Sequence, residues 1–96
     1  MTILRQYSLQ AAEGRETALR EALTALASQV RACAGCEKVE ILADAQDAKF
    51  YLFTEHWRNV DVREAAGARL GKAAFAPVFE TLGERPQARD LLPVNG

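Results

Sequence analysis

Two cysteines with C-x-x-C spacing are the first residues in this sequence whose types and positions could carry chemistry. Cys33 and Cys36 could form a redox pair or supply two ligands to a metal ion. A redox pair of this kind lies at the start of a helix, where the macrodipole lowers the thiol pKa, whereas this pair follows a helical pattern. A structural zinc site needs two further ligands, and His56 is the only histidine. We therefore expect two small residues at a turn, and no metal.

Four other side chains are suited to acid-base or binding chemistry. Tyr7 could donate a hydrogen bond to a substrate oxygen or join a proton relay, or it could be a phenol at the rim of the core. Arg69 could hold an oxyanion or face solvent. Glu55 could act as a base if burial raises its pKa, or it could be a charge at a strand end. Trp57 could stack on an aromatic substrate or close the core.

The single histidine has an unperturbed pKa that suits a general base near neutrality. Side chains alternate between the two faces of a strand, so His56 faces the opposite way from Glu55 and Trp57. If Trp57 lines a pocket, His56 therefore faces a subunit interface or the rim. We expect an interface histidine.

Length and composition predict one globular domain spanning residues 1–96. The chain is 49% hydrophobic and 26% charged, with a formal charge of -1. It has no basic block that could neutralise a series of phosphates, so we expect no nucleic acid partner. The N-terminus does not resemble a secretion signal, and no apolar run approaches the length of a membrane span. We expect a cytoplasmic protein with no membrane partner.

Hydrophobic periodicity predicts the secondary structure. Alternating residues predict four strands, at 3–9, 36–42, 50–57 and 87–94. Apolar residues at helical spacing predict helices at 15–31, 61–70 and 73–82. The last two helical pieces join near Gly71, Pro77 belongs near the start of the second piece or at a kink, and residues 95–96 form a frayed tail. The order β-α-β-β-α-β predicts an α+β, ferredoxin-like domain, with a four-stranded antiparallel sheet and its helices on one face.

The strand at 50–57 is apolar on both faces. Phe50 and Leu52 share one face with His56. The other face carries Tyr51, Phe53, Glu55 and Trp57. The helices of one chain can cover only one face, so we expect a second copy of the chain to cover the other, in a two-fold homodimer. We assign Phe50, Leu52 and His56 to the subunit seam and the other set to the side under the helices.

Four short motifs occur in order along nearly the whole chain. They are Ala12–Glu16 after the first strand, Ala34–Cys36 before the second, Phe50–Trp57 ending in Glu-x-Trp, and the Leu-x-x-x-x-Phe segment within Leu70–Phe79. Together they resemble the antibiotic biosynthesis monooxygenase family, whose members are dimeric α/β barrels. The resemblance implies that fold and a homodimer through the open face of the sheet.

The same resemblance separates two kinds of chemistry. Haem-degrading members use a helix histidine, a strand asparagine and a helix tryptophan, and alignment places Phe79, Tyr7 and Arg69 at those positions. Phe and Arg are not iron ligands, so haem is not expected. The quinol- and polyketide-oxidising members use no metal or flavin, because the phenolic substrate itself is thought to reduce oxygen. The resemblance therefore implies a cofactor-independent monooxygenase acting on a small aromatic or quinol-type molecule in a cavity between sheet and helices.

Eight residues are expected at that site. The catalytic candidates are Trp57, Tyr7, Arg69 and Glu55, and the substrate-binding candidates are Tyr51, Phe53, Phe75 and Phe79. A cavity of roughly a few hundred cubic ångströms beside Tyr7, Trp57 and Arg69 would favour an enzyme. The alternatives are a non-catalytic, small-ligand-binding or stress-associated dimer, which the lack of a helix histidine favours, and an isomerase or lyase, because fold does not fix function.

Overall fold

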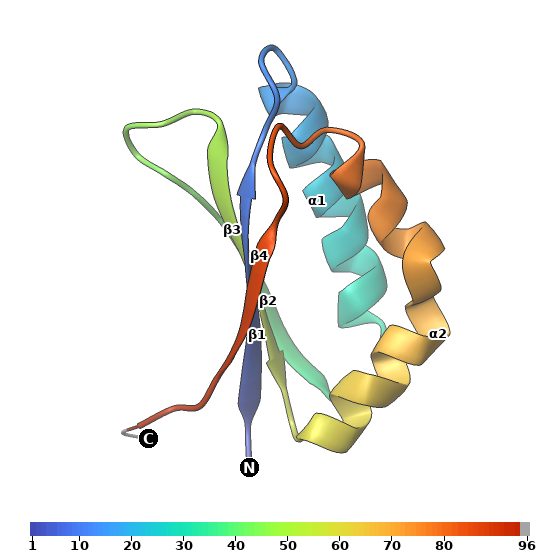
Figure 1. The fold of residues 1–96 in the computed structure, drawn as a ribbon. Coiled ribbons are helices and arrows are strands. Elements are labelled where there is room, and N and C mark those ends of the chain that lie inside the picture. The colour runs from blue at the N-terminus through green and yellow to red at the C-terminus, as the bar shows by residue number, and fades with distance from the viewer. Residues whose placement is uncertain (95–96) are drawn as a thin grey trace.

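The four strands form one antiparallel sheet, and both helices lie against the same face of it (Figure 1). The computed structural model describes residues 1–94, so the tail expected at 95–96 lies outside the described residues. The elements are β1 (Ile3–Gln10), α1 (Glu16–Arg31), β2 (Cys36–Ala43), β3 (Phe50–Trp57), α2 (Val60–Phe79) and β4 (Gln87–Leu91). The strand order is β2-β3-β1-β4. The predicted ferredoxin-like α+β fold is confirmed.

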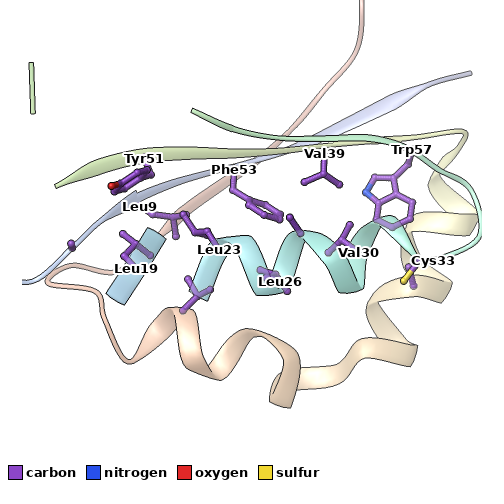
Figure 2. Packing of buried hydrophobic residues seen from close by; sticks show 14 of the residues in the cluster. Leu9, Leu19, Leu23, Leu26, Val30, Cys33, Val39, Tyr51, Phe53 and Trp57 are labelled. Atoms are coloured by element: carbon purple, nitrogen blue, oxygen red, sulfur yellow. The ribbon is translucent and has the colours of Figure 1, made fainter. Parts of the chain in front are cut away.

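Helix α1 packs its apolar stripe on the sheet. The buried residues of the helix are Leu19, Leu23, Leu26, Ala27 and Val30, which recur at the spacing of one helical face. They join Leu9, Tyr51, Phe53 and Trp57 from the sheet in one continuous core. Figure 2 shows Tyr51 and Trp57 at opposite ends of this core, with Phe53 between them. The central strands and α1 therefore form most of the hydrophobic core.

Helix α2 is divided by a kink at Gly71, where φ is 67° and ψ is -177°. This left-handed backbone is accessible to glycine at little cost, and it interrupts the helical phase between the two halves. The junction predicted near Gly71 is thus confirmed. Pro77 was expected near the start of the second half or at a kink; it lies in the last turn of that half, away from the kink at Gly71. The helix ends at Phe79, so a proline at this position removes only one hydrogen bond, close to the helix end.

The turn from α1 to β2 packs against the beginning of α2. Gly35 has a φ of 86°, and a Cβ added there would lie 2.5 Å from Cγ2 of Val62. The helix itself begins after Asn59, whose Oδ1 accepts a hydrogen bond from the Val62 backbone N–H. This contact fixes the first half of α2 over one end of the sheet.

Within residues 1–94, no helix has the length and apolar character needed to span a membrane.

The strand register sets which side chains meet under the helices. Ile3 stands opposite Trp57, and Tyr7 stands opposite Phe53. Between these two pairs, Arg5 of β1 lies directly between Glu55 of β3 and Asp90 of β4. Residues directly opposite one another share a sheet face, so this row of three charged residues faces the helices. The assignment of Glu55 and Trp57 to the helix side is confirmed.

The other face of the sheet is covered by neither helix. It carries Leu42 opposite Leu52, and Leu4 opposite Leu91, as two apolar cross-strand pairs. His56 lies on this face, where its Nε2 is 3.5 Å from Oε1 of Glu40. The single histidine is therefore on the face opposite Trp57, as the alternation predicted.

Candidate active site

A cavity of about 390 Å³ lies between β1 and α2. Arg5 and Tyr7 of β1 form one side of it. Helix α2 supplies the remaining lining residues, which are Gly67, Gly71, Lys72, Phe75 and Phe79. This volume is within the range of sites that bind small organic ligands.

Three aromatic rings form the apolar part of the cavity. The centroids of the Tyr7 and Phe75 rings are 6.3 Å apart, and those of Phe75 and Phe79 are 6.4 Å apart with planes inclined by 23°. Tyr7 also meets Phe53 of the core, at 6.2 Å. The Phe79 side chain is 51% exposed. An aromatic ligand would find ring faces to stack on here and would cover Phe79.

Arg5 and Tyr7 form the polar part of the cavity. Nε of Arg5 donates a hydrogen bond to the Tyr7 hydroxyl over 3.4 Å, and the guanidinium lies 5.3 Å from the centre of the Tyr7 ring. Burial raises the pKa of Tyr7, and the hydrogen bond from Arg5 opposes this only in part. The hydrogen bond to Tyr7 also raises the pKa of Arg5. The pair therefore presents a permanent cation beside a neutral phenol that can donate a hydrogen bond.

One carboxylate holds two arginines at the edge of the sheet. Oδ1 of Asp90 is 3.2 Å from Nη1 of Arg5, and its Oδ2 is 3.8 Å from Nη2 of Arg63 on α2. Nε of Arg63 is buried and has no hydrogen-bond partner among residues 1–94. One carboxylate thus contacts two guanidinium groups, of which only that of Arg5 lines the cavity.

Glu55 and Trp57 lie beside Arg5, within the core. They are 4% and 2% exposed, and Nε1 of Trp57 donates a hydrogen bond to Oε1 of Glu55 over 2.8 Å. Burial raises the pKa of Glu55, while the indole hydrogen bond and the charges of Arg5 and Arg63 lower it by less. Glu55 is thus a buried carboxyl group with a cation next to it in the sheet.

The eight expected site residues fall into four groups. Tyr7, Phe75 and Phe79 line the cavity. Glu55, which stands opposite Arg5 in the sheet, and Trp57 do not line the cavity. Phe53 and Tyr51 are packed into the core, where the Tyr51 hydroxyl accepts a hydrogen bond from Nε of Arg20. Arg69 is exposed and lines a separate hollow of about 120 Å³ with Cys33 and Val62. The structure therefore does not bring Tyr7, Trp57 and Arg69 together around one cavity.

The position of Arg69 follows from the kink in α2. Arg69 belongs to the first half of the helix, and the break at Gly71 changes the direction of the residues that follow. Lys72, rather than Arg69, is the helix cation at the cavity. The sequence interpretation also omitted Arg5 as a site residue, although strand alternation places it on the same face as Tyr7. No local sequence pattern indicates that Asp90 and Arg63 meet near Arg5, because this contact depends on the pairing of β4 with β1.

The two cysteines lie at the turn, with neither thiol at the cavity. Sγ of Cys33 is buried and 3.5 Å from the Gln29 carbonyl, and Sγ of Cys36 is 3.9 Å from the Lys38 carbonyl. Burial raises the pKa of the Cys36 thiol, which lowers its thiolate fraction. In the described part of the chain, no cluster of three or more His, Cys, Asp or Glu residues could hold a metal ion.

A sequence comparison identifies the family, and structure comparisons find similar folds. Residues 2–80 match the family model described as antibiotic biosynthesis monooxygenase. The fold is similar to that of PA3566 from Pseudomonas aeruginosa, with 24% identity, a TM-score of 0.84, and coverage of 98% of this chain and 95% of that one. Rv0793 from Mycobacterium tuberculosis is 18% identical with a TM-score of 0.86, covering 100% and 98% of the two chains.

A third similar structure has a described activity. SnoaB from Streptomyces nogalater, a cofactor-independent oxygenase, has a TM-score of 0.85 at 9% identity, and the match covers 99% of this chain and 95% of SnoaB. No curated protein sequence matches the chain. At these identities the structural matches establish the fold.

Proposed function

Because this chain belongs to the antibiotic biosynthesis monooxygenase family, we propose that it is a cofactor-independent monooxygenase for a small aromatic or quinol-type substrate. The observation that carries the proposal is the make-up of the cavity between β1 and α2. Its rings come from Tyr7, Phe75 and Phe79, and the Arg5 guanidinium is held against the Tyr7 hydroxyl. The description of the structurally similar SnoaB as a cofactor-independent oxygenase supports the same reaction class.

In this reaction the phenolic substrate is itself the reductant of molecular oxygen. One oxygen atom becomes bonded to a substrate carbon, and the other leaves as water with two hydrogens from the substrate. Atoms and electrons balance without a further electron donor. Arg5 and Tyr7 would hold the ionised phenol oxygen, because a cation and a neutral hydroxyl donor both stabilise developing negative charge. The rings would orient the substrate.

Oxygen uptake with a panel of hydroquinones and anthrones tests this proposal. We expect consumption of one O₂ per substrate, with one labelled oxygen atom in the product when ¹⁸O₂ is supplied. Arg5→Gln should lower kcat by about 10²-fold, as expected for loss of a preorganised positive donor, and Tyr7→Phe should lower it less. Arg58→Gln removes a charge from the exposed turn after β3 and should leave uptake unchanged. Wild-type uptake no faster than the reaction without protein would exclude the monooxygenase. Equal, protein-dependent uptake by the wild type and Arg5→Gln would exclude the role of Arg5.

One observation favours a second candidate, a protein that binds an aromatic ligand without converting it. Within residues 1–94, neither a carboxylate nor a histidine side chain lines the cavity, so none of these is placed to take the phenol proton. The pKa of Glu55 is raised, but Glu55 stands opposite Arg5 in the sheet and does not line the cavity. Saturable binding of a hydroquinone under anaerobic conditions, with no oxygen uptake in air, would favour this candidate.

A homodimer through the open face of the sheet is the second part of the proposal. The family is one of dimeric barrels, and the apolar pairs Leu42–Leu52 and Leu4–Leu91 lie on the face that no helix covers. A second copy related by a two-fold axis would bury both pairs. A small aromatic molecule in each cavity and one further copy of the chain are the proposed partners.

Sedimentation at micromolar concentration tests the dimer. The wild-type chain should sediment as two copies, and Leu52→Glu should shift it to one copy, because a carboxylate in the interface would lose its hydration. Val60→Glu is the matched control, since it places the same charge on an exposed apolar residue of α2. A wild-type protein that sediments only with the mass of one chain would contradict the proposal.

A further inference from the structure

Positive and negative charges are not balanced around the cavity. Among the described residues, its lining includes the two cations Arg5 and Lys72 and no carboxylate. The carboxylates on either side of Arg5 in the sheet already have partners. Asp90 contacts both Arg5 and Arg63, and Glu55 accepts the hydrogen bond of the Trp57 indole. The cavity therefore has room for the negative charge of a ligand.

Lys72 differs from the other two lysines of the chain. Lys38 forms an ion pair with Glu40, and Lys49 forms one with Glu13. Among residues 1–94, no carboxylate oxygen lies within 4.0 Å of the Lys72 amino group. Lys72 directly follows the kink, on the half of α2 that carries Phe75 and Phe79. In the described part of the chain it is an exposed cation without a carboxylate partner, on the same half-helix as two aromatic residues of the cavity.

We infer that the cavity takes a planar aromatic phenol that also bears a carboxylate, and that Lys72 is the residue that selects the carboxylate. This inference rests on the proposed function, which assigns the phenol oxygen to Arg5 and Tyr7. Arg5 already holds a carboxylate and a hydroxyl, whereas the ammonium group of Lys72 has no anion. An ion pair at the rim of an apolar cavity is screened less than one in open solvent. The volume of about 390 Å³ suits a fused ring system.

A matched pair of ligands separates charge from shape. The ligand 6-hydroxy-2-naphthoate carries the carboxylate, and 6-hydroxy-2-naphthamide has the same ring and phenol without the charge. Affinity is measured by calorimetry in the absence of oxygen, which the proposed reaction requires, so neither phenol can be converted. We expect the acid to bind the wild-type protein about tenfold more tightly at low ionic strength, and we expect added salt to reduce this preference.

Three variants assign the preference to its residue. Lys72→Gln should abolish the preference for the acid while leaving the affinity for the amide unchanged, and Lys72→Arg should retain it. Lys49→Gln makes the same change of net charge outside the cavity and should keep the wild-type preference. Gly67→Leu should weaken both ligands, because a side chain built at Gly67 meets no other atom within 4 Å at its Cβ and would occupy the cavity.

The outcomes separate this inference from the proposed function. Equal affinity of the wild-type protein for acid and amide, no binding of either, or a preference that survives Lys72→Gln would each overturn the role of Lys72. A preference lost in Lys72→Gln upholds it. Oxygen uptake is measured separately, so a protein that shows the preference but consumes no oxygen with any substrate contradicts the monooxygenase alone.

Discussion

The indole N–H of Trp57 donates a hydrogen bond to the carboxyl of Glu55 over 2.8 Å, and both side chains are withdrawn from solvent. The bond joins two residues on the same face of β3, so the strand itself sets their spacing. Arg5 stands opposite Glu55 in β1. The carboxyl group thus has a neutral donor on its own strand and a cation on the next, and its protonation is linked to the stability of the sheet.

The first prediction concerns the pH dependence of stability. Burial raises the pKa of Glu55 above its ordinary value of 4.5, so above that value the folded chain holds this proton more tightly than the unfolded chain. The stability from this group is present below 4.5 and is lost as pH rises through the raised pKa. Glu55→Gln keeps an oxygen for the Trp57 N–H and should remove this loss. Urea denaturation at several pH values measures it, and a wild-type-to-variant difference that is independent of pH would contradict it.

A second prediction concerns Asp90, whose carboxylate anchors Arg5 and Arg63. Asp90→Asn should lower kcat/KM for oxygen uptake about tenfold, because Arg5 loses the contact that fixes its position beside Tyr7. The free energy of unfolding should change by less than about 1 kcal/mol, since the Asp90 side chain is 41% exposed. Asp90→Glu should restore part of the activity. Glu13→Gln removes the carboxylate of an ion pair outside the cavity, and equal effects of the two amide variants on kcat/KM would contradict the prediction.

A third prediction contrasts the two glycines that line the cavity. Gly67 has an ordinary helical backbone and Gly71 has a φ of 67°, and a Cβ at either position meets no atom within 4 Å. Gly67→Ala should therefore stabilise the protein by about 0.5–1 kcal/mol, because alanine favours the helix. Gly71→Ala should destabilise it by about 1–2 kcal/mol, because an L residue at positive φ is strained. Urea midpoints that shift in the same direction would contradict this assignment.

A fourth prediction separates backbone strain from steric overlap. Gly35→Ala combines a φ of 86° with a Cβ only 2.5 Å from Val62, so we expect a loss of about 3 kcal/mol. Gly14 has a φ of 78° with open space around it, so Gly14→Ala should lose only about 1–2 kcal/mol. The difference between the two in chemical denaturation measures the packing of the α1–β2 turn on α2. Equal losses would show that Val62 moves aside at no cost.

The sheet and its helix-covered face could be predicted because each depends on a local repeat. The alternation in β3 assigned Tyr51, Phe53 and Trp57 to one side and His56 to the other, and the structure has this arrangement. The stripe of α1 is equally local. In both cases the pattern extends over several turns or pairs, so one exceptional residue does not alter the result.

The cavity was less predictable, because it depends on contacts between distant elements. The phase of α2 changes at Gly71, so helical spacing counted from residues 61–70 does not place Lys72. The pairing of β4 with β1 brings Asp90 to Arg5 over 85 positions, and no periodicity reports such a contact. Tyr51 and Phe53 were expected to bind substrate because they face the side under the helices. Both do face that side, and packing against α1 buries them.

The kink at Gly71 divides helix α2 into two halves that make different contacts. The first half is fixed by its contact with Gly35 and by the cap at Asn59, whereas the second half carries Lys72, Phe75 and Phe79. Residues of the second half therefore determine the shape and charge of one side of the cavity, while Arg5 and Tyr7 on β1 form the other side. A library restricted to residues 72–79 would vary the helix side of the cavity and leave the sequence of the sheet unchanged.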